Sequence, residues 1–428
     1  MKPDGFCYAA WKPLNIVKKE HQLPAHPYFV VSAQSNGDFI AVAAEEAGGI
    51  SHFYRLDHLH LEDGWQKTGD FVEGEVNALK ATVFDKIFAF GVDKKTGHSL
   101  VATSYDEGRT WSQSEIIDGS AHYDSVAFSY VRSTDASGKD VFNGIGVATG
   151  RDGAIAITTS KISLDQKNGI IWKQTQAPSH AAKKVVYVPT GGTPQQPDFS
   201  FVLITDPADY FSGLLLTHDC ATVVGTTTYS KDGETWLTSP SIFLTSSFPT
   251  GGYNSQALIH HINADENTGK EAHNEAFLTD DVNTNKDHVF SSPCNNLGDL
   301  AKAVSSFKTT SQFHELEALF DVTDFFASPY IFVGFGSDKK TGKPVSFLSP
   351  STPLPANLIF YRYFMIEDLP QPFLGIAHGG VSLQRDSSGN FIKNDNGFGY
   401  KTEGEDLLLA LGSDGTCYTT STLINRVQ

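Results

Sequence analysis

Carboxylates in short, turn-like stretches are the groups in this sequence that most clearly offer chemistry. These stretches contain Glu45, Glu46, Asp93, Asp152, Asp206, Asp209, Asp280, Asp281, Asp338 and Asp414. Carboxylate oxygens bind hard cations such as Ca²⁺ and accept hydrogen bonds from basic or hydroxyl-rich ligands. Aspartate near glycine is also what tight turns require for their own backbone. We therefore explain each single turn by backbone geometry and keep an acidic, ligand-binding rim as a hypothesis for the whole set.

The stretch DPADYFSGLLLTHDCAT, residues 206–222, is the main candidate for a ligand loop. It separates two apolar runs that read as paired strands, and long loops in compact repeat folds usually carry function. Its carboxylates and aromatic rings would line a pocket in which the rings stack on a sugar; these residues are Asp206, Asp209, Tyr210 and Phe211. Residues 280–299 form a second insertion of the same kind.

Histidines give only a weak indication of a metal site. In Asp57-His58-Leu59-His60 two imidazoles fall on one side of an extended strand, and His260 and His261 are adjacent. A zinc site needs further ligands that the sequence does not locate, so we interpret these as ordinary core or surface histidines. We expect no organic cofactor, and Ca²⁺ is the metal that the acidic turns would suit.

Pairs of apolar runs joined by turns would position these groups. Such hairpins occur at residues 39–55, 86–104, 141–160, 199–230, 330–349 and 406–422. A further hairpin begins with 275–281, whose partner strand is either 288–293 or 303–311. The turn DKKTG occurs twice, at 93–97 and 338–342, which indicates internal duplication. Alternating and fully apolar runs of this length are typical of strands buried between stacked sheets. Seven hairpins recurring at this spacing predict an all-β fold, a seven-bladed β-propeller, with six blades as the alternative.

The tryptophans mark a further strand in each repeat. Trp11, Trp65, Trp111, Trp172 and Trp236 are followed by similar polar residues, one for each of five repeats. The last hairpin has no tryptophan strand after it, and Trp11 has no hairpin before it. We therefore predict one propeller domain, 1–428, in which residues 6–16 complete the last blade with 406–422 and close the ring. Cys7 and Cys417 would then lie in neighbouring strands, either as a disulfide or, as we favour, as two thiols.

The stretch SYDEGRTWSQ, residues 104–113, recurs in shortened form as YSKDGETWLT at 229–238. The pattern S-x-D-x-G-x-T-W comprises Ser104, Asp106, Gly108, Thr110 and Trp111, and then Ser230, Asp232, Gly233, Thr235 and Trp236. It resembles the Asp-box repeat of sialidases, some xyloglucanases and sortilin-type receptors, with a stretched third version at 163–172. The carboxylate would accept bonds from its own turn, and glycine permits a positive φ. We assign the motif a structural role; the resemblance implies that ligands bind on the opposite face.

The same resemblance implies how a sialidase would bind its substrate, and this chain departs from that pattern. Sialidases clamp a carboxylate with three arginines and use a tyrosine paired with glutamate. This chain has seven arginines, none before Arg55, and one of them, Arg109, falls within the Asp-box. We therefore do not expect sialidase activity. Arg151 and Arg362 remain candidate ligand-binding residues, together with Asp93 and Asp338.

Overall charge excludes some partners. The net charge of −17 disfavours nucleic acids and anionic membranes, which need a basic surface. No apolar run reaches the ~18 residues of a membrane span, and the N-terminus lacks a leader-like apolar stretch, so we expect a cytoplasmic or non-classically exported protein, or a secreted one if a leader was removed. The expected function is lectin-like or protein-binding recognition without catalysis. The alternatives are a glycoside hydrolase using Asp93, Asp209 or Asp338, and a structural propeller in a larger assembly.

Overall fold

The structure is a computed structural model. It describes residues 6–7, 11–33, 36–44, 49–82, 85–129, 131–134, 140–150, 153–163, 165–175, 182–193, 196–205, 214–217, 220–223, 226–230, 232–240, 245–246, 255–265, 270–280, 288–293, 320–327, 331–350, 365–388, 392–393, 401–421 and 425–426. Within these ranges, no helix has the length and apolar character needed to cross a membrane.

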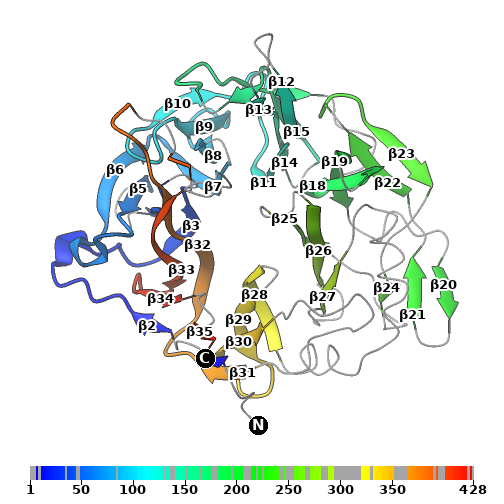
Figure 1. Ribbon diagram of the computed structural model, residues 1–428. Helices are drawn as coiled ribbons and strands as arrows, with labels where there is room; N and C mark the ends of the chain where they lie inside the picture. Colours follow the sequence, from blue (N-terminus) through cyan, green and yellow to red (C-terminus); the bar gives the residue numbers. More distant parts are fainter. Residues whose placement is uncertain are drawn as a thin grey trace.

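Antiparallel sheets follow one another along the chain and are arranged in a ring (Figure 1). Sheet 1 contains β3 (Pro27–Ser32), β4 (Phe39–Ala44), β5 (Ser51–Leu56) and β6 (Gln66–Phe71). Sheet 2 contains β7 (Gly74–Ala81), β8 (Ile87–Asp93), β9 (Ser99–Ser104) and β10 (Ser112–Glu115). Sheet 3 contains β11 (Tyr123–Phe128), β14 (Gly146–Gly150), β15 (Ile155–Thr158) and β17 (Trp172–Thr175).

The remaining sheets of the ring repeat this order. Sheet 4 contains β18 (Ala182–Thr193), β19 (Gln196–Thr205), β22 (Thr226–Ser230) and β23 (Leu237–Pro240). Sheet 5 contains β25 (Ser255–Asp265), β26 (Lys270–Asp280) and β27 (His288–Pro293). Sheet 6 contains β28 (Phe320–Ala327), β29 (Ile331–Asp338), β30 (Pro344–Pro350) and β31 (Met365–Asp368). Sheet 7 contains β32 (Phe373–Leu383), β33 (Thr402–Gly412), β34 (Cys417–Ser421) and β2 (Lys12–Pro13).

Smaller pieces lie outside these sheets. Three short sheets join β1 (Phe6–Cys7) to β35 (Asn425–Arg426), β12 (Val131–Thr134) to β13 (Asp140–Gly144) and β16 (Ile162–Ser163), and β20 (Leu214–Thr217) to β21 (Cys220–Val223) and β24 (Thr245–Ser246). The described helical residues form two single 3₁₀ turns, Lys19–His21 and Leu61–Asp63. The all-β propeller predicted from the sequence is confirmed. The count of seven blades stays a prediction, because sheet 5 has three strands among the described residues.

Each predicted hairpin supplies the second and third strands of a sheet, and the first strand lies on the inner side of the ring (Figure 1). The described tryptophans mark the outer strand. Trp11, Trp65, Trp111 and Trp236 each stand immediately before it, and Trp172 is its first residue. This placement puts a large apolar ring between an outer strand and its neighbouring sheet, where apolar area is removed from water.

The apolar core lies between neighbouring sheets. Between sheets 2 and 3, Phe88 and Phe90 meet Trp172, which is fully buried; the rings of Phe90 and Trp172 are 4.9 Å apart and nearly perpendicular, at 86°. Between sheets 1 and 7, Phe39 and Trp65 share a cluster with residues of β33 and β34. Edge-to-face packing of this kind adds to the stabilisation from burial.

The N-terminal segment closes the ring, as the sequence predicts. Lys12 and Pro13 pair with Thr419 and Tyr418 of β34, so β2 is the outer strand of sheet 7. Figure 1 shows the blue start of the chain beside its red end. One detail of the prediction is wrong. Cys7 does not reach the strand next to Cys417, because β1 pairs with β35 in a separate two-stranded sheet. Cys417 is a free, buried thiol.

The sheets have two ends, which define two faces of the ring. In sheet 2, Asp93 pairs with Gly74 at one end, and Ser104 pairs with Ile87 at the other. We call the first end the Asp93 face; it carries the connections between second and third strands. The second end, the Asp106 face, carries the connections between third and fourth strands. The Asp338 turn follows β29 and so belongs to the Asp93 face, and the Asp232 turn follows β22 on the Asp106 face.

Candidate functional site

The turn between β9 and β10 is organised around the Asp106 carboxylate. Its Oδ1 accepts the backbone N–H of Thr110 at 2.8 Å and the Ser104 hydroxyl at 2.9 Å, and its Oδ2 accepts the Thr110 hydroxyl at 2.6 Å. The backbone N–H of Gly108 donates to Ser104 Oγ at 2.7 Å. Burial raises the pKa of Asp106, but the bonds from Thr110 and Ser104 outweigh it, so the net pKa lies below its ordinary value. The polar atoms of the motif are thus engaged within their own turn.

The same turn is fixed to the preceding sheet. Trp111 stacks on Phe53 of β5 with ring centroids 3.8 Å apart and an angle of 11°, and its indole N–H donates to Thr68 Oγ1 at 3.2 Å. Gly108 has a φ of +83°, and a Cβ there would lie 2.4 Å from Cδ1 of Ile40. Glycine is required at this position for both its backbone conformation and its close approach.

The turn after β22 repeats this arrangement between sheets 4 and 3, as the Asp106 turn does between sheets 2 and 1. Asp232 Oδ1 accepts the backbone N–H groups of Glu234 at 2.9 Å and Thr235 at 2.7 Å. Gly233 has a φ of +76°, and a Cβ there would lie 2.7 Å from Val147 of sheet 3. Trp236 packs against the cluster between sheets 3 and 4. Both turns therefore join a sheet to the one before it; the side chain of Ser230 lies outside the described residues.

Asp93 and Asp338 also serve their own turns. Asp93 Oδ1 accepts the backbone N–H groups of Lys95 at 2.7 Å and Thr96 at 2.8 Å. Asp338 Oδ1 accepts those of Lys340 at 3.0 Å and Thr341 at 2.7 Å. The bond from the Thr96 N–H lowers the pKa of Asp93 most, and the bond from the Thr341 N–H does so for Asp338. The two carboxylates lie in sheets 2 and 6, which are not neighbours, and so do not form a pair.

The other predicted ligand residues are Arg151, Asp206, Asp209, Tyr210, Phe211 and Arg362, which lie outside the described residues. Asp414 of the acidic set is described. Its Oδ1 accepts the Thr416 backbone N–H at 2.8 Å and Gln371 Nε2 at 2.6 Å. Asp93, Asp338 and Asp414 thus each accept backbone N–H groups of their own turn. This supports the interpretation that each single acidic turn is explained by the needs of its own backbone.

The histidine stretch after β5 meets a partner that sequence reasoning missed. Asp38, in the turn before β4, is buried and accepts the His58 backbone N–H at 3.1 Å and His58 Nδ1 at 2.9 Å through the same oxygen. Its other oxygen accepts from Arg55 and from Asn36 Nδ2. One potential ligand atom each from Asp38, Asp57 and His58 lies within 4.8 Å of the others. The guanidinium already paired with Asp38 disfavours a cation there, so we interpret this cluster as a buried ion network.

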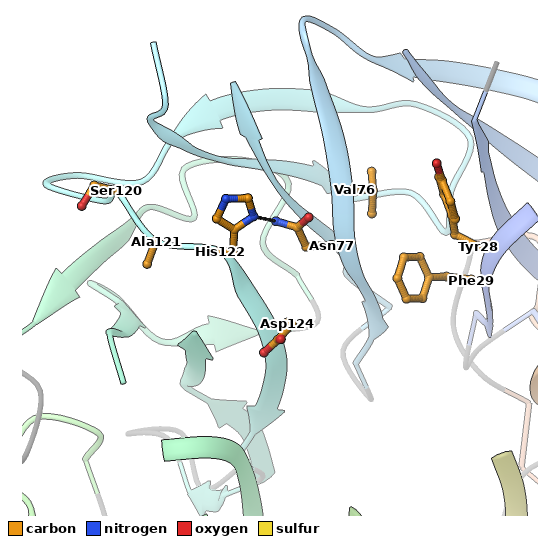
Figure 2. A pocket seen from close by; sticks show the side chains of 8 residues that line it. All are labelled: Tyr28, Phe29, Val76, Asn77, Ser120, Ala121, His122 and Asp124. Atoms are coloured by element: carbon orange, nitrogen blue, oxygen red, sulfur yellow. Dashed lines mark hydrogen bonds between the residues drawn. The ribbon is translucent and has the colours of Figure 1, made fainter. Parts of the chain in front are cut away.

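A cavity of about 490 Å³ opens on the Asp93 face, across the inner strands of sheets 1, 2 and 3. Its lining residues are Tyr28, Phe29, Val76, Asn77, Ser120, Ala121, His122 and Asp124 (Figure 2). Val76 pairs with Gly91, close to Asp93, and Tyr123 pairs with Gly150 at the corresponding end of sheet 3, which fixes the face. The volume lies within the range of about 300–1,000 Å³ that is typical of ligand pockets.

Hydrogen bonds hold the polar wall of this cavity. Asn77 Nδ2 lies 3.2 Å from Nδ1 of His122, as Figure 2 shows. Gln174 Oε1 accepts the Ser120 backbone N–H at 3.2 Å and the Tyr123 hydroxyl at 2.9 Å, and so fixes the segment that carries His122. With the amide donating to Nδ1, the neutral imidazole carries its proton on Nε2 and presents a donor. Asp124 adds acceptor oxygens.

The residues of this cavity were not among the predicted site residues. They come from three sheets, and Asn77 and His122 stand 45 positions apart, so no local motif marks them. The cavity opens opposite the Asp106 turn, on the face where the Asp-box resemblance implies that ligands bind; that implication stays a prediction. The only local signal is a pair of adjacent aromatic residues, Tyr28 and Phe29, at the start of a strand.

Comparisons with known proteins give weak similarities. No protein-family model matches the chain, and no curated protein matches it significantly in sequence. Among solved structures, YCF48 from Cyanidioschyzon merolae is 11% identical, with 96% of this chain and 99% of that chain covered and a TM-score of 0.40. Hydrazine synthase from Kuenenia stuttgartiensis gives 10% identity, coverages of 96% and 99%, and a TM-score of 0.41.

An α-L-arabinofuranosidase from Fusarium graminearum, solved with an iminosugar inhibitor, is 11% identical, with 83% and 95% of the two chains covered and a TM-score of 0.39. At these identities and scores, neither family nor function is transferred to this chain.

Proposed function

We propose that this protein is a non-catalytic recognition propeller that binds carbohydrate in the cavity on the Asp93 face. The observation that carries the proposal is the cavity itself, built by the inner strands of three consecutive sheets and the segment just before β11, and lined by two aromatic rings, an amide, an imidazole and a carboxylate. Aromatic and amphipathic side chains with a few placed polar groups are the usual lining of a small-ligand site. A protein partner would instead need a surface of about 800 Å² on this chain.

Recognition is favoured over hydrolysis by the number of carboxylates. Glycoside hydrolysis commonly requires two carboxyl groups about 5–10 Å apart across the sugar. Of the described residues that line the cavity, Asp124 is the one carboxylate. Asp93 and Asp338, which the hydrolase alternative would use, are bound to their own turns. A glycoside hydrolase is therefore the second candidate.

The scaffold part of the proposal concerns the Asp106 face. We propose that the turns at residues 104–111 and 230–236 are Asp-boxes with a structural role, within one domain of seven blades. Support comes from the shared pattern of both turns: an aspartate that accepts N–H groups of its own turn, a glycine of positive φ and a tryptophan against the preceding sheet. Ca²⁺ on the acidic rim remains a proposal, and the experiment below tests it directly.

A glycan array probed with the intact protein tests the function, once in Ca²⁺ and once in EDTA. We expect selective binding that His122→Ala abolishes, because the donor on Nε2 is lost. His98→Ala is the matched control, since His98 also lies on the Asp93 face, outside the lining, and its side chain is 56% exposed. A blank array in both buffers would overturn the proposal. Cleavage of bound glycans would establish the hydrolase instead, and loss of binding in EDTA would add a metal.

A further inference from the structure

The cavity has two chemically different halves, separated by the inner strand of sheet 2. Val76 and Asn77 are adjacent on β7, at a point where the pairing with β8 shifts register between Val76 and Ala78. Figure 2 shows Val76 toward Tyr28 and Phe29, and Asn77 toward His122. A ligand that uses the whole cavity must therefore lie across β7.

The half beside sheet 1 is aromatic. The rings of Tyr28 and Phe29 have centroids 6.1 Å apart at an angle of 48°, so they form two walls of different orientation rather than one stack. Phe29 packs on the core cluster between sheets 1 and 2, whereas the Tyr28 side chain is held at the surface with 39% of the residue exposed. Such a surface removes the apolar face of a ring from water.

The half beside sheet 3 is polar and offers both kinds of hydrogen-bonding group. His122, oriented by Asn77, presents a donor at Nε2, and Asp124 lines the same half with a carboxylate whose Oδ1 is buried. A hydroxyl group both donates and accepts, so neighbouring hydroxyls on one ring match this combination.

The charge of the lining disfavours anions. The eight described lining residues include one carboxylate and no lysine or arginine, and the whole chain carries a net charge of −17. Recognition of a carboxylate, sulfate or phosphate normally uses arginine or lysine. A sugar that carries such a group would meet the Asp124 carboxylate and no lysine or arginine among the described lining residues.

We infer that the ligand is a short, neutral oligosaccharide of at least two units that lies across β7. One unit packs on Tyr28 and Phe29, and the next forms hydrogen bonds with His122 and Asp124. This inference rests on the proposed function and deepens it, since it specifies the charge of the ligand and its minimum length.

Calorimetric titration with unbranched neutral pentose and hexose oligosaccharides of one to four units tests this inference, with sialylated and uronic-acid oligosaccharides as anionic probes. We expect affinity to rise by about tenfold or more from one unit to two, which is the gain of one further good contact. Tyr28→Ala and Asp124→Asn should each weaken binding of the two-unit ligand by about tenfold. The anionic probes should bind more weakly than neutral ones of equal length.

Leu374→Ala is the matched control for Tyr28→Ala. Leu374 is also 39% exposed and is the second residue of the inner strand β32, but it does not line the cavity. We expect its titration curve to match that of the unaltered protein, and thermal unfolding of all variants establishes that they are folded.

The outcomes separate the two proposals. Anionic probes that bind as tightly as neutral ones, with the same loss in Asp124→Asn, would overturn the inference and leave carbohydrate recognition in place. A single unit that binds as tightly as two, or binding that only one of the two variants weakens, would overturn the bridging arrangement. If no carbohydrate of either class binds, the proposed function itself fails.

Discussion

The indole N–H of Trp11 donates to the hydroxyl of Ser346 at 3.0 Å, across 335 positions of the sequence. Ser346 belongs to β30 in sheet 6, whereas the two residues after Trp11 pair with β34 in sheet 7. The Trp11 ring also meets Phe373 of β32 edge-on, with centroids 5.5 Å apart. The N-terminal segment therefore joins two sheets, in addition to filling an edge.

Trp11→Phe should destabilise the fold by at least about 1 kcal/mol, because an aromatic ring is retained while one hydrogen bond and part of the indole volume are lost. Trp11→Ala should cost more, since it also removes the apolar contact with Phe373. Urea denaturation followed by circular dichroism measures both free energies of unfolding. Equal stability of all three proteins would show that this segment does not hold the ring.

Gly108→Ala should destabilise the turn for two reasons that can be separated. The new Cβ would lie 2.4 Å from Ile40 Cδ1, and alanine would adopt a φ of +83°. Gly97→Ala is the control for the backbone effect, about 1–2 kcal/mol, because Gly97 has a φ of +74° and open space around a Cβ. Gly108→Ala should cost more than Gly97→Ala.

The steric part of that cost should couple to Ile40. In an Ile40→Val background, which removes Cδ1, Gly108→Ala should destabilise the protein less than in the unaltered chain. Strict additivity of the two free-energy changes in a double-mutant cycle would contradict the close approach described between the Asp106 turn and sheet 1.

Asp106→Asn should lower stability at pH 7 by about 1–3 kcal/mol without altering ligand binding, because the carboxylate is engaged within the turn on the opposite face. The folded-state pKa of Asp106 is lowered, so its contribution is complete above the ordinary value of 3.8 and is lost as pH falls through the folded value. The gap between the denaturation midpoints of variant and parent should therefore narrow as pH falls below about 4. A gap at pH 2 as large as the one at pH 7 would contradict this assignment.

His58 should make the protein less stable in mild acid. Burial lowers the pKa of His58, and the nearby Arg55 adds to this, against the opposing charges of Asp57 and Glu403. With the folded pKa below the unfolded one, stability is complete above about pH 6.5 and declines as pH falls below it, because the unfolded chain binds the proton more readily. Urea midpoints should fall between pH 7.5 and 5.5, and His58→Gln should flatten this slope; an unchanged slope would contradict it.

Cys417 should not react with alkylating reagents in the folded protein. Burial raises the pKa of its thiol to about 12, and the residue is 4% exposed in the cluster between sheets 1 and 7. Since the thiolate is the reactive form, iodoacetamide at pH 8 should modify Cys417 only after unfolding. Peptide mapping by mass spectrometry distinguishes it from the other three cysteines, and rapid labelling under native conditions would contradict the packing.

Local patterns predicted the parts of this fold that depend on neighbouring residues. The hairpins follow from apolar runs bounded by turn residues, and Asp106 follows from a motif whose members lie within one turn. Strand β2 could be predicted because Trp11 has no hairpin before it and the last hairpin has no tryptophan strand after it. The first segment of the chain therefore supplies the strand that the last sheet lacks. Cys7 was misplaced because the strand divides into β1 and β2, which have different partners.

The candidate site escaped prediction because its residues meet only in three dimensions. Tyr28, Asn77 and His122 are separated by tens of residues and belong to three sheets. Asp38 was missed for the same reason, since it approaches His58 from another strand connection. Asp93 and Asp338 were conspicuous in the sequence because tight turns need aspartate. The motif that drew attention to them therefore reports the hydrogen bonds of a turn and not a ligand site.

The pairing of β2 with β34 also sets an order of events during synthesis. Residues 12–13 leave the ribosome long before their partners 418–419. The described strands of sheets 1 to 6 have all been synthesised before residues 418–419 emerge. Until then, residues 12–13 have no strand to pair with, and their backbone groups stay unpaired. This pairing joins segments from the two ends of the ring, so ring closure should be the slow step of folding and the time when a nascent chain most needs a chaperone.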